Sequence, residues 1–162
     1  MKSMALLKDE RERNWMKREI SLLKQVKHPN VTEFIGISKD PENNLLIVME
    51  FVPGGELYAV LQKKDVVIDW PLRLKIAHDV AAALSFMHAR SVIHRDIKSE
   101  NLLMGENWNV KLCDFGFARA VESKERQRMT MCGSPYFNAP ELLLGKPYNE
   151  KVKNFCSPFF FF

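Results

Sequence analysis

The chain has 162 residues, a formal net charge of +4, 46% hydrophobic residues and 27% charged residues. This length accommodates one domain with its own core and is too short for two, and the composition is ordinary for a soluble globular protein. No apolar run approaches the roughly 20 residues of a membrane span, and the amino-terminus lacks a signal-peptide pattern.

The net charge bears on nucleic-acid binding, and the cysteines bear on the cellular compartment. Much of the positive charge comes from Lys and Arg scattered through the first thirty residues, so a nucleic-acid patch is not expected. The three cysteines, Cys113, Cys132 and Cys156, are odd in number and follow no C-x-x-C metal spacing. They are typical of free thiols in a reducing compartment, which indicates a cytoplasmic or nuclear protein.

The first predicted element is an amphipathic helix from Asp9 to Lys27, in which apolar residues recur on one face. Glu19 lies at the edge of that face. A carboxylate buried there without a cation would cost several kcal/mol, so a basic partner is one interpretation. An ordinary solvated glutamate is the other.

A β-hairpin is predicted next. Two β-rich apolar runs, Val31 to Ile37 and Leu45 to Phe51, flank the turn-forming segment 40–44. Pro53 and the glycine pair 54–55 then end the second strand and allow the chain to enter a helix.

Two helices are expected after the hairpin. Glu56 to Lys64 is short and amphipathic, and Leu72 to His88 carries apolar residues at 3.6-residue spacing, as in a core helix. Asp69 is a plausible N-cap for the longer helix, with Pro71 near its first turn.

The most informative stretch follows the long helix. It reads His94-Arg95-Asp96-Ile97-Lys98-Ser99-Glu100-Asn101 and, after a short strand, Asp114-Phe115-Gly116. Asp96 is a carboxylate that could orient a substrate hydroxyl or accept its proton, and Lys98 could reach a transferring phosphate. Asn101 and Asp114 supply oxygen donors of the kind that Mg²⁺ prefers.

These stretches match H-R-D-x-K-x-x-N and D-F-G, and the chain resembles eukaryotic protein kinases of the serine/threonine type. The resemblance implies an incomplete α+β two-lobe fold: residues 1–52 as a partial small lobe with its regulatory helix and hinge, and 53–152 as a partial helical large lobe. It also implies transfer of the ATP γ-phosphate to a protein Ser or Thr, with ATP and Mg²⁺ bound.

The resemblance assigns further roles. Lys2 would be the last residue of a V-A-I-K strand and would pair with Glu19, although Lys2 could also be an unremarkable terminal residue. His94 would be structural, packed under Phe115. The residues implied at the adenine are Met49 as gatekeeper, the hinge from Glu50 to Val52, and Leu103.

Regulation would involve the segment from Asp114 to Glu141, which ends in Ala139-Pro140-Glu141 like the activation segment of this family. Thr130 would be a phosphorylation site whose added charge draws in Arg95, although a plain surface threonine is the alternative. Ser134 matches the residue that commonly bonds to the catalytic Asp and Lys. Lys98 favours Ser/Thr substrates, and the phrasing around it resembles the tyrosine-kinase-like, Raf-related branch.

The chain departs from the family pattern at both ends. The G-x-G-x-x-G loop is absent, and residues 153–162 form an apolar tail unlike the family, which we attribute to an unspliced intron or a frame error. Three readings therefore stay open: a kinase fragment, a non-catalytic kinase-like binding or decoy module, and an unstable product. The sequence does not predict the substrate, the activator or the oligomeric state.

Overall fold

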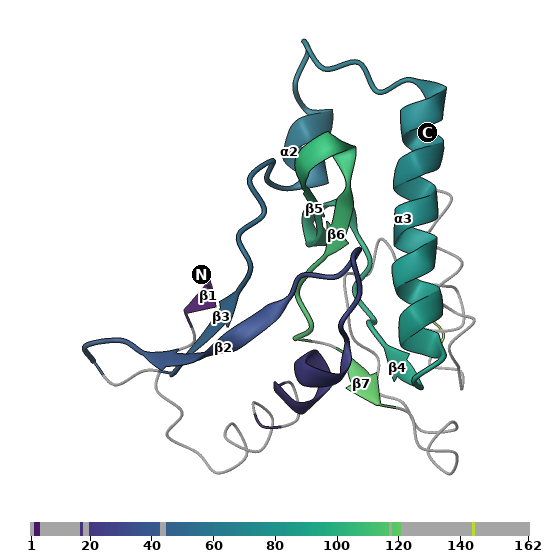
Figure 1. Ribbon diagram of the computed structural model, residues 1–162. Coiled ribbons are helices and arrows are strands. Elements are labelled where there is room, and N and C mark those ends of the chain that lie inside the picture. The colour runs from purple at the N-terminus through teal and green to yellow at the C-terminus, as the bar shows by residue number, and fades with distance from the viewer. Residues whose placement is uncertain are drawn as a thin grey trace.

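The computed structural model describes residues 2–3, 17, 20–42, 45–116, 118–120 and 144. These residues combine small antiparallel sheets with helices, which confirms the α+β class (Figure 1). A three-stranded sheet lies on one side, and the long helix α3 (Trp70–His88) runs beside a short hairpin on the other.

The three-stranded sheet has the order β1-β3-β2 and is antiparallel throughout. Its strands are β1 (Lys2–Ser3), β2 (Phe34–Lys39) and β3 (Leu45–Met49). Ile37 pairs with Ile47, and the register shifts between Phe34 and Gly36. The predicted hairpin is therefore confirmed.

The predicted start of the first strand, Val31, is wrong. Val31 instead bridges to Leu112, and the Thr32 amide donates to the Leu112 carbonyl at 3.0 Å. The cause is that backbone groups at a buried strand edge must find partners, and residues 30–32 supply them to a strand far along the chain.

Part of the predicted amino-terminal helix falls within the described residues. Residue 17 and residues 20–25 are helical, and residues 26 and 27 are not, so the helix ends two residues before the predicted Lys27. The rest of the predicted span lies outside the described residues. Leu22, Leu23 and Val26 are buried, as the periodicity predicts.

Helix α3 matches its prediction closely. Asp69 caps it, because its carboxylate accepts a hydrogen bond from the Leu72 amide at 3.0 Å, and Pro71 occupies the first turn. The shorter helix α2 (Leu57–Leu61) ends three residues before the predicted Lys64. Leu57 and Val60 of α2 are buried, whereas residues 62–64 are exposed, so burial does not stabilise a longer helix.

The remaining elements are short and lie beside α3. They are β4 (Val92–Ile93), η1 (Ser99–Asn101), β5 (Leu102–Met104), η2 (Glu106–Trp108), β6 (Val110–Leu112) and β7 (Arg119–Ala120). Strands β5 and β6 form an antiparallel hairpin beside α3, and β4 pairs with β7 near the carboxyl end of that helix (Figure 1).

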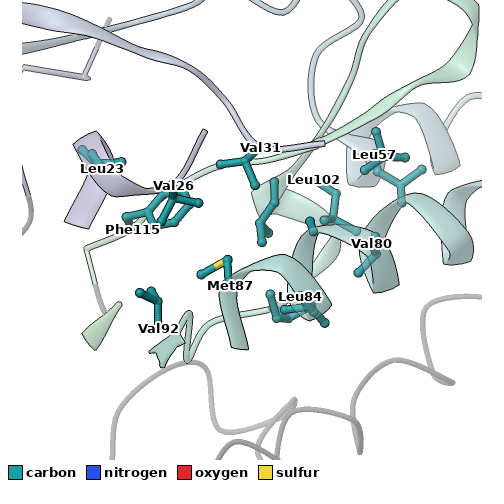
Figure 2. Close-up of a cluster of buried hydrophobic side chains, with 14 of the residues drawn as sticks. Leu23, Val26, Val31, Leu57, Val80, Leu84, Met87, Val92, Leu102 and Phe115 are labelled. Carbon is teal, nitrogen blue, oxygen red and sulfur yellow. The ribbon is translucent and has the colours of Figure 1, made fainter. Parts of the chain in front are cut away.

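One hydrophobic cluster joins these parts. It brings Leu23 and Val26 against Phe115, and continues through Val31 and Leu102 to the buried face of α3 (Figure 2). Because the cluster draws on segments from both sides of the molecule, it fixes their relative position. Within the part of the chain that the structure describes, no helix has the length and apolar character needed to cross a membrane.

Candidate active site

The segment after β4 is anchored through His94. The His94 side chain is fully buried, its Nε2 lies 2.9 Å from the Cys113 carbonyl oxygen, and its ring meets that of Phe115 edge-on at 5.1 Å between centroids. The Nε2–H tautomer donates to that carbonyl, which leaves Nδ1 as acceptor for the Asp96 amide at 3.4 Å. His94 therefore ties the 94–98 loop to the segment around residue 113.

Asp96 is the centre of a polar cluster. It is only 4% exposed. The Asn101 Nδ2 donates to the Asp96 main-chain oxygen at 2.7 Å and to its Oδ2 at 2.9 Å, and Lys98 Nζ lies 3.0 Å from Oδ2. These charge-assisted contacts hold the carboxylate in one orientation and satisfy it in its buried place.

Asn101 and Asp114 are linked through the backbone. The Cys113 amide donates to the Asn101 carbonyl at 2.9 Å, so the residue before Asp114 is bonded directly to Asn101. Asp114 has a φ of +58°, which is uncommon outside glycine, and its Oδ1 accepts from the Gly116 amide at 3.2 Å. Backbone strain of this kind concentrates at functional sites. The backbone therefore brings Asp114 next to the pair formed by Asp96 and Asn101.

The segment predicted as the hinge follows β3. Met49 ends that strand opposite Phe34, and the Glu50 amide donates to the Glu33 carbonyl at 2.9 Å. The Glu50 carboxylate Oε1 accepts from the Glu33 amide and from Lys111 Nζ, both at 2.8 Å. Glu50 thus connects the end of the sheet to strand β6.

The sequence comparisons agree with this geometry. A model described as protein kinase domain matches residues 1–157. The chain belongs to the protein kinase family. The incomplete two-lobe kinase fold expected from the motifs is therefore confirmed, while the lobe boundaries at residues 52 and 152 stay predictions.

Three relatives from Dictyostelium discoideum illustrate the match. The probable serine/threonine-protein kinase kinX is 43% identical over 157 residues, covering 93% of this chain and 14% of kinX. The RasGEF domain-containing serine/threonine-protein kinase X is 44% identical over 142 residues, covering 87% of this chain and 15% of its own length. A further probable serine/threonine-protein kinase is 43% identical over 141 residues, covering 87% of this chain and 15% of that relative.

The chain therefore spans about 15% of the length of these relatives. Their names support the serine/threonine type. The Raf-related branch stays a prediction.

Other predicted kinase residues are placed as follows. Leu103 pairs with Lys111 across the β5–β6 hairpin and bridges to Glu56, and Val52 is buried. Arg95, directly before Asp96, has a φ of +69°. The backbone of Lys2 lies in β1 opposite Ile47. Glu19, Thr130 and Ser134 lie outside the described residues, so the predicted Lys2–Glu19 pair and the phosphorylation switch stay predictions.

The donor chemistry of the cluster fits a divalent cation. Both Nδ2 contacts of Asn101 go to Asp96, so the amide oxygen is the group it can offer to a metal ion. Together with the Asp114 carboxylate it makes the small oxygen set that Mg²⁺ uses alongside phosphate oxygens. Among the described residues no group of three or more His, Cys, Asp or Glu side chains could hold a metal ion.

Two interactions were missed from the sequence. One is the Glu50–Lys111 contact, because the hinge was expected to act through its backbone alone. The other is the ion pair between Lys75 and Asp79, a buried carboxylate on α3 that the apolar periodicity of that helix does not predict. Its spacing of four residues from Lys75 was the available signal.

Proposed function

We propose that this chain carries protein serine/threonine kinase chemistry, the transfer of the ATP γ-phosphoryl group to a Ser or Thr hydroxyl of a protein. The observation that supports it most is the polar cluster around Asn101. The Asn101 side-chain amide donates to Asp96, and the Asn101 main-chain carbonyl accepts from the amide of Cys113, next to Asp114. Phosphoryl transfer requires chiefly positioning and neutralisation of charge, and this cluster holds groups suited to both.

Each residue has a distinct part in that reaction. Asp96 accepts the proton of the substrate hydroxyl while the oxygen forms its bond to the γ-phosphorus and the bond from phosphorus to the β-bridging oxygen breaks. Lys98, 3.0 Å from Asp96 Oδ2, places a positive charge beside the transferring group. Asn101 and Asp114 would hold Mg²⁺, which would neutralise charge on the phosphate oxygens.

The adenine would be held by the hinge. The backbone from Glu50 to Val52 would pair with the base, between the gatekeeper Met49 and Leu103. Both the anchoring of Glu50 to Lys111 and the buried state of Val52 favour a hinge held in one conformation. We further propose a cytoplasmic or nuclear location, membership of the Raf-related branch, and activation by phosphorylation of Thr130.

The direct test is transfer of radiolabelled phosphate from ATP to a basic test protein, followed by phosphoamino-acid analysis. We expect phosphoserine and phosphothreonine without phosphotyrosine. Asp96→Asn should lower the rate by at least about 100-fold, since general-base groups contribute on the order of 10²–10⁴.

Lys27→Met is the matched control. It removes the cation of an exposed ion pair to Glu33, outside the site, and should leave the rate unchanged. A melting transition that Mg²⁺-ATP raises, without any phosphate transfer, would instead indicate a non-catalytic nucleotide-binding module. A chain with no cooperative transition would indicate an unstable product.

A further inference from the structure

The turn between β5 and β6 is held in an unfavourable backbone conformation. Asn107 and Trp108 have φ values of +53° and +61°. Asparagine adopts such angles more readily than most residues, but for tryptophan they are unfavourable and need surrounding contacts to hold them. The turn is closed by its own backbone bonds, from the Gly105 amide to the Asn109 carbonyl at 2.7 Å and from the Asn109 amide to the Glu106 carbonyl at 3.1 Å, and helix α3 adds side-chain contacts to it.

Lys75 on α3 makes three contacts with its ammonium group. Its Nζ lies 2.9 Å from Asp79 Oδ2, 3.1 Å from the Trp108 carbonyl and 2.9 Å from Asn109 Oδ1. An ammonium group has three protons, so these acceptors use all of them. Lys75 therefore binds both α3 and the strained turn.

Asp79 completes the attachment one helical turn later. Its side chain is 10% exposed, and its Oδ2 also accepts from the Val110 amide at 3.1 Å. The next backbone groups on this edge of β6 bond to Asn30, in the loop that precedes β2. Asn30 Nδ2 donates to the Val110 carbonyl, and the Leu112 amide donates to the Asn30 carbonyl. Asp79 thus supplies the partner at the first residue of the strand, where that loop does not reach.

The hairpin carries both residues that would bind the metal ion. Asn101 immediately precedes β5, and Asp114 follows β6 by two residues. From Val110 to Asp114 the chain extends at most about 13 Å at 3.3 Å per residue. The same helix leads at its carboxyl end into β4 and the loop that bears Asp96. Helix α3 is therefore a common support for the hairpin and for Asp96 (Figure 1).

We propose that Lys75 and Asp79 are positioning residues that fix the β5–β6 hairpin on α3, and thereby set where Asn101 and Asp114 present their oxygens to nucleotide-bound Mg²⁺. This inference rests on the proposed kinase function. The hinge that would bind adenine is held to the same hairpin by other contacts: Glu50 bonds to Lys111, and the backbones of Gly54 and Gly55 bond to Met104. These contacts do not involve Lys75 or Asp79, so loss of the pair should impair the metal-dependent part of nucleotide binding more than adenine binding.

The test compares ATP affinity of the full chain with Mg²⁺ and with EDTA, by calorimetry, for Lys75→Met and Asp79→Asn. Both variants should lower the Mg²⁺-induced gain in affinity by about 10-fold, the scale seen when groups behind metal ligands are removed. Affinity in EDTA should stay within about twofold. Lys75→Arg keeps the positive charge but not the compact ammonium, so it should lose less of the gain than Lys75→Met. Amide hydrogen exchange at Val110 should be faster in the unliganded Lys75→Met variant, in which the turn loses its ammonium contacts.

Matched variants keep the proposal falsifiable. Lys27→Met removes another lysine ion pair, 85% exposed on the lysine side, and should preserve the Mg²⁺ effect. Asp79→Asn removes the charge that pairs with Lys75 but retains an oxygen for the Val110 amide. Its Mg²⁺ effect therefore tests the positioning role if Lys75→Met does not fold. An unchanged Mg²⁺ effect, or equal losses with and without Mg²⁺, would overturn the positioning role. Failure of the unsubstituted chain to bind Mg²⁺-ATP would overturn the kinase proposal itself.

Discussion

Asn101 donates from its side-chain nitrogen to two oxygens of Asp96, the main-chain carbonyl at 2.7 Å and the carboxylate Oδ2 at 2.9 Å. Both residues are buried, at 5% and 4% exposure. The same amide therefore fixes the residue that would handle the substrate proton and presents its oxygen as a metal ligand. Loss of Asn101 should affect stability and catalysis together.

Replacing Asn101 with Ala should destabilise the fold by about 1–3 kcal/mol, because a buried Asp96 oxygen loses its donor. Phosphate transfer should fall at least about 100-fold, since one ligand for Mg²⁺ and the orientation of Asp96 are both lost. Urea denaturation and the radiolabel assay would measure these effects. Full activity in a folded Asn101→Ala chain would contradict the assigned role.

Gly54 is required by the close approach of two backbones. A Cβ at this position would lie 2.2 Å from the Met104 carbonyl oxygen, to which the Gly54 amide donates at 2.8 Å. Gly54→Ala should therefore lower the free energy of unfolding by about 2–3 kcal/mol or more, the cost of forced backbone shifts. Gly36→Ala is the control, because nothing lies within 4 Å of a Cβ there.

Gly54→Ala should leave the midpoint of urea denaturation well below that of Gly36→Ala. The second glycine of the pair is constrained differently: Gly55 has open space but a φ of +73°. Gly55→Ala should cost about 1–2 kcal/mol, through backbone strain alone. Equal midpoints for the Gly54 and Gly36 variants would show that the two segments do not approach as described.

The Glu50–Lys111 contact should stabilise the fold measurably. Its side chains are 24% and 23% exposed, so solvent screens them less than a surface pair. A double-mutant cycle with Glu50→Gln and Lys111→Met should give a coupling free energy of about 1 kcal/mol. The cycle for Lys27→Met and Glu33→Gln, an 85% and 53% exposed pair, should give less than about 0.5 kcal/mol. Indistinguishable couplings would contradict an anchoring role for Lys111.

Some of these residues could be predicted from the sequence, and others could not. Asp96, Asn101 and Asp114 were found because their types and spacing are local, and the 3.6-residue period with the Asp69 cap located α3 within two residues of its start. Glu50 and Lys111 are 61 positions apart, and Asp79 and Val110 are 31 apart. Nothing in local periodicity specifies such pairs, because they arise only when the chain is packed. The start of β2 was misplaced for the same reason, because residues 31–32 pair with Leu112 of β6 and not with β3.

His28 should make stability depend on pH. Burial, and secondarily the positive charge of Arg90, lower the pKa of His28 below its ordinary value of 6.5. Its ring packs on Phe86 at 4.9 Å between centroids, with the Arg90 guanidinium over the same Phe86 ring, and its Nδ1 accepts from the Asn30 amide at 3.1 Å. Protonation would abolish that acceptor and place a second positive charge near Arg90.

Because the folded state resists protonation, the unfolded state binds more protons below pH of about 6.5, the ordinary histidine value. Stability should therefore be highest above that pH and fall as the pH drops from 6.5 toward the lower pKa of the folded state. Urea midpoints measured at intervals from pH 7.5 to about 5 would show this slope. His28→Asn, which can still accept from the Asn30 amide, should flatten it. Arg90→Met should reduce the slope without removing it, because burial is the larger cause. An identical slope in the His28→Asn variant would assign the pH dependence to other groups.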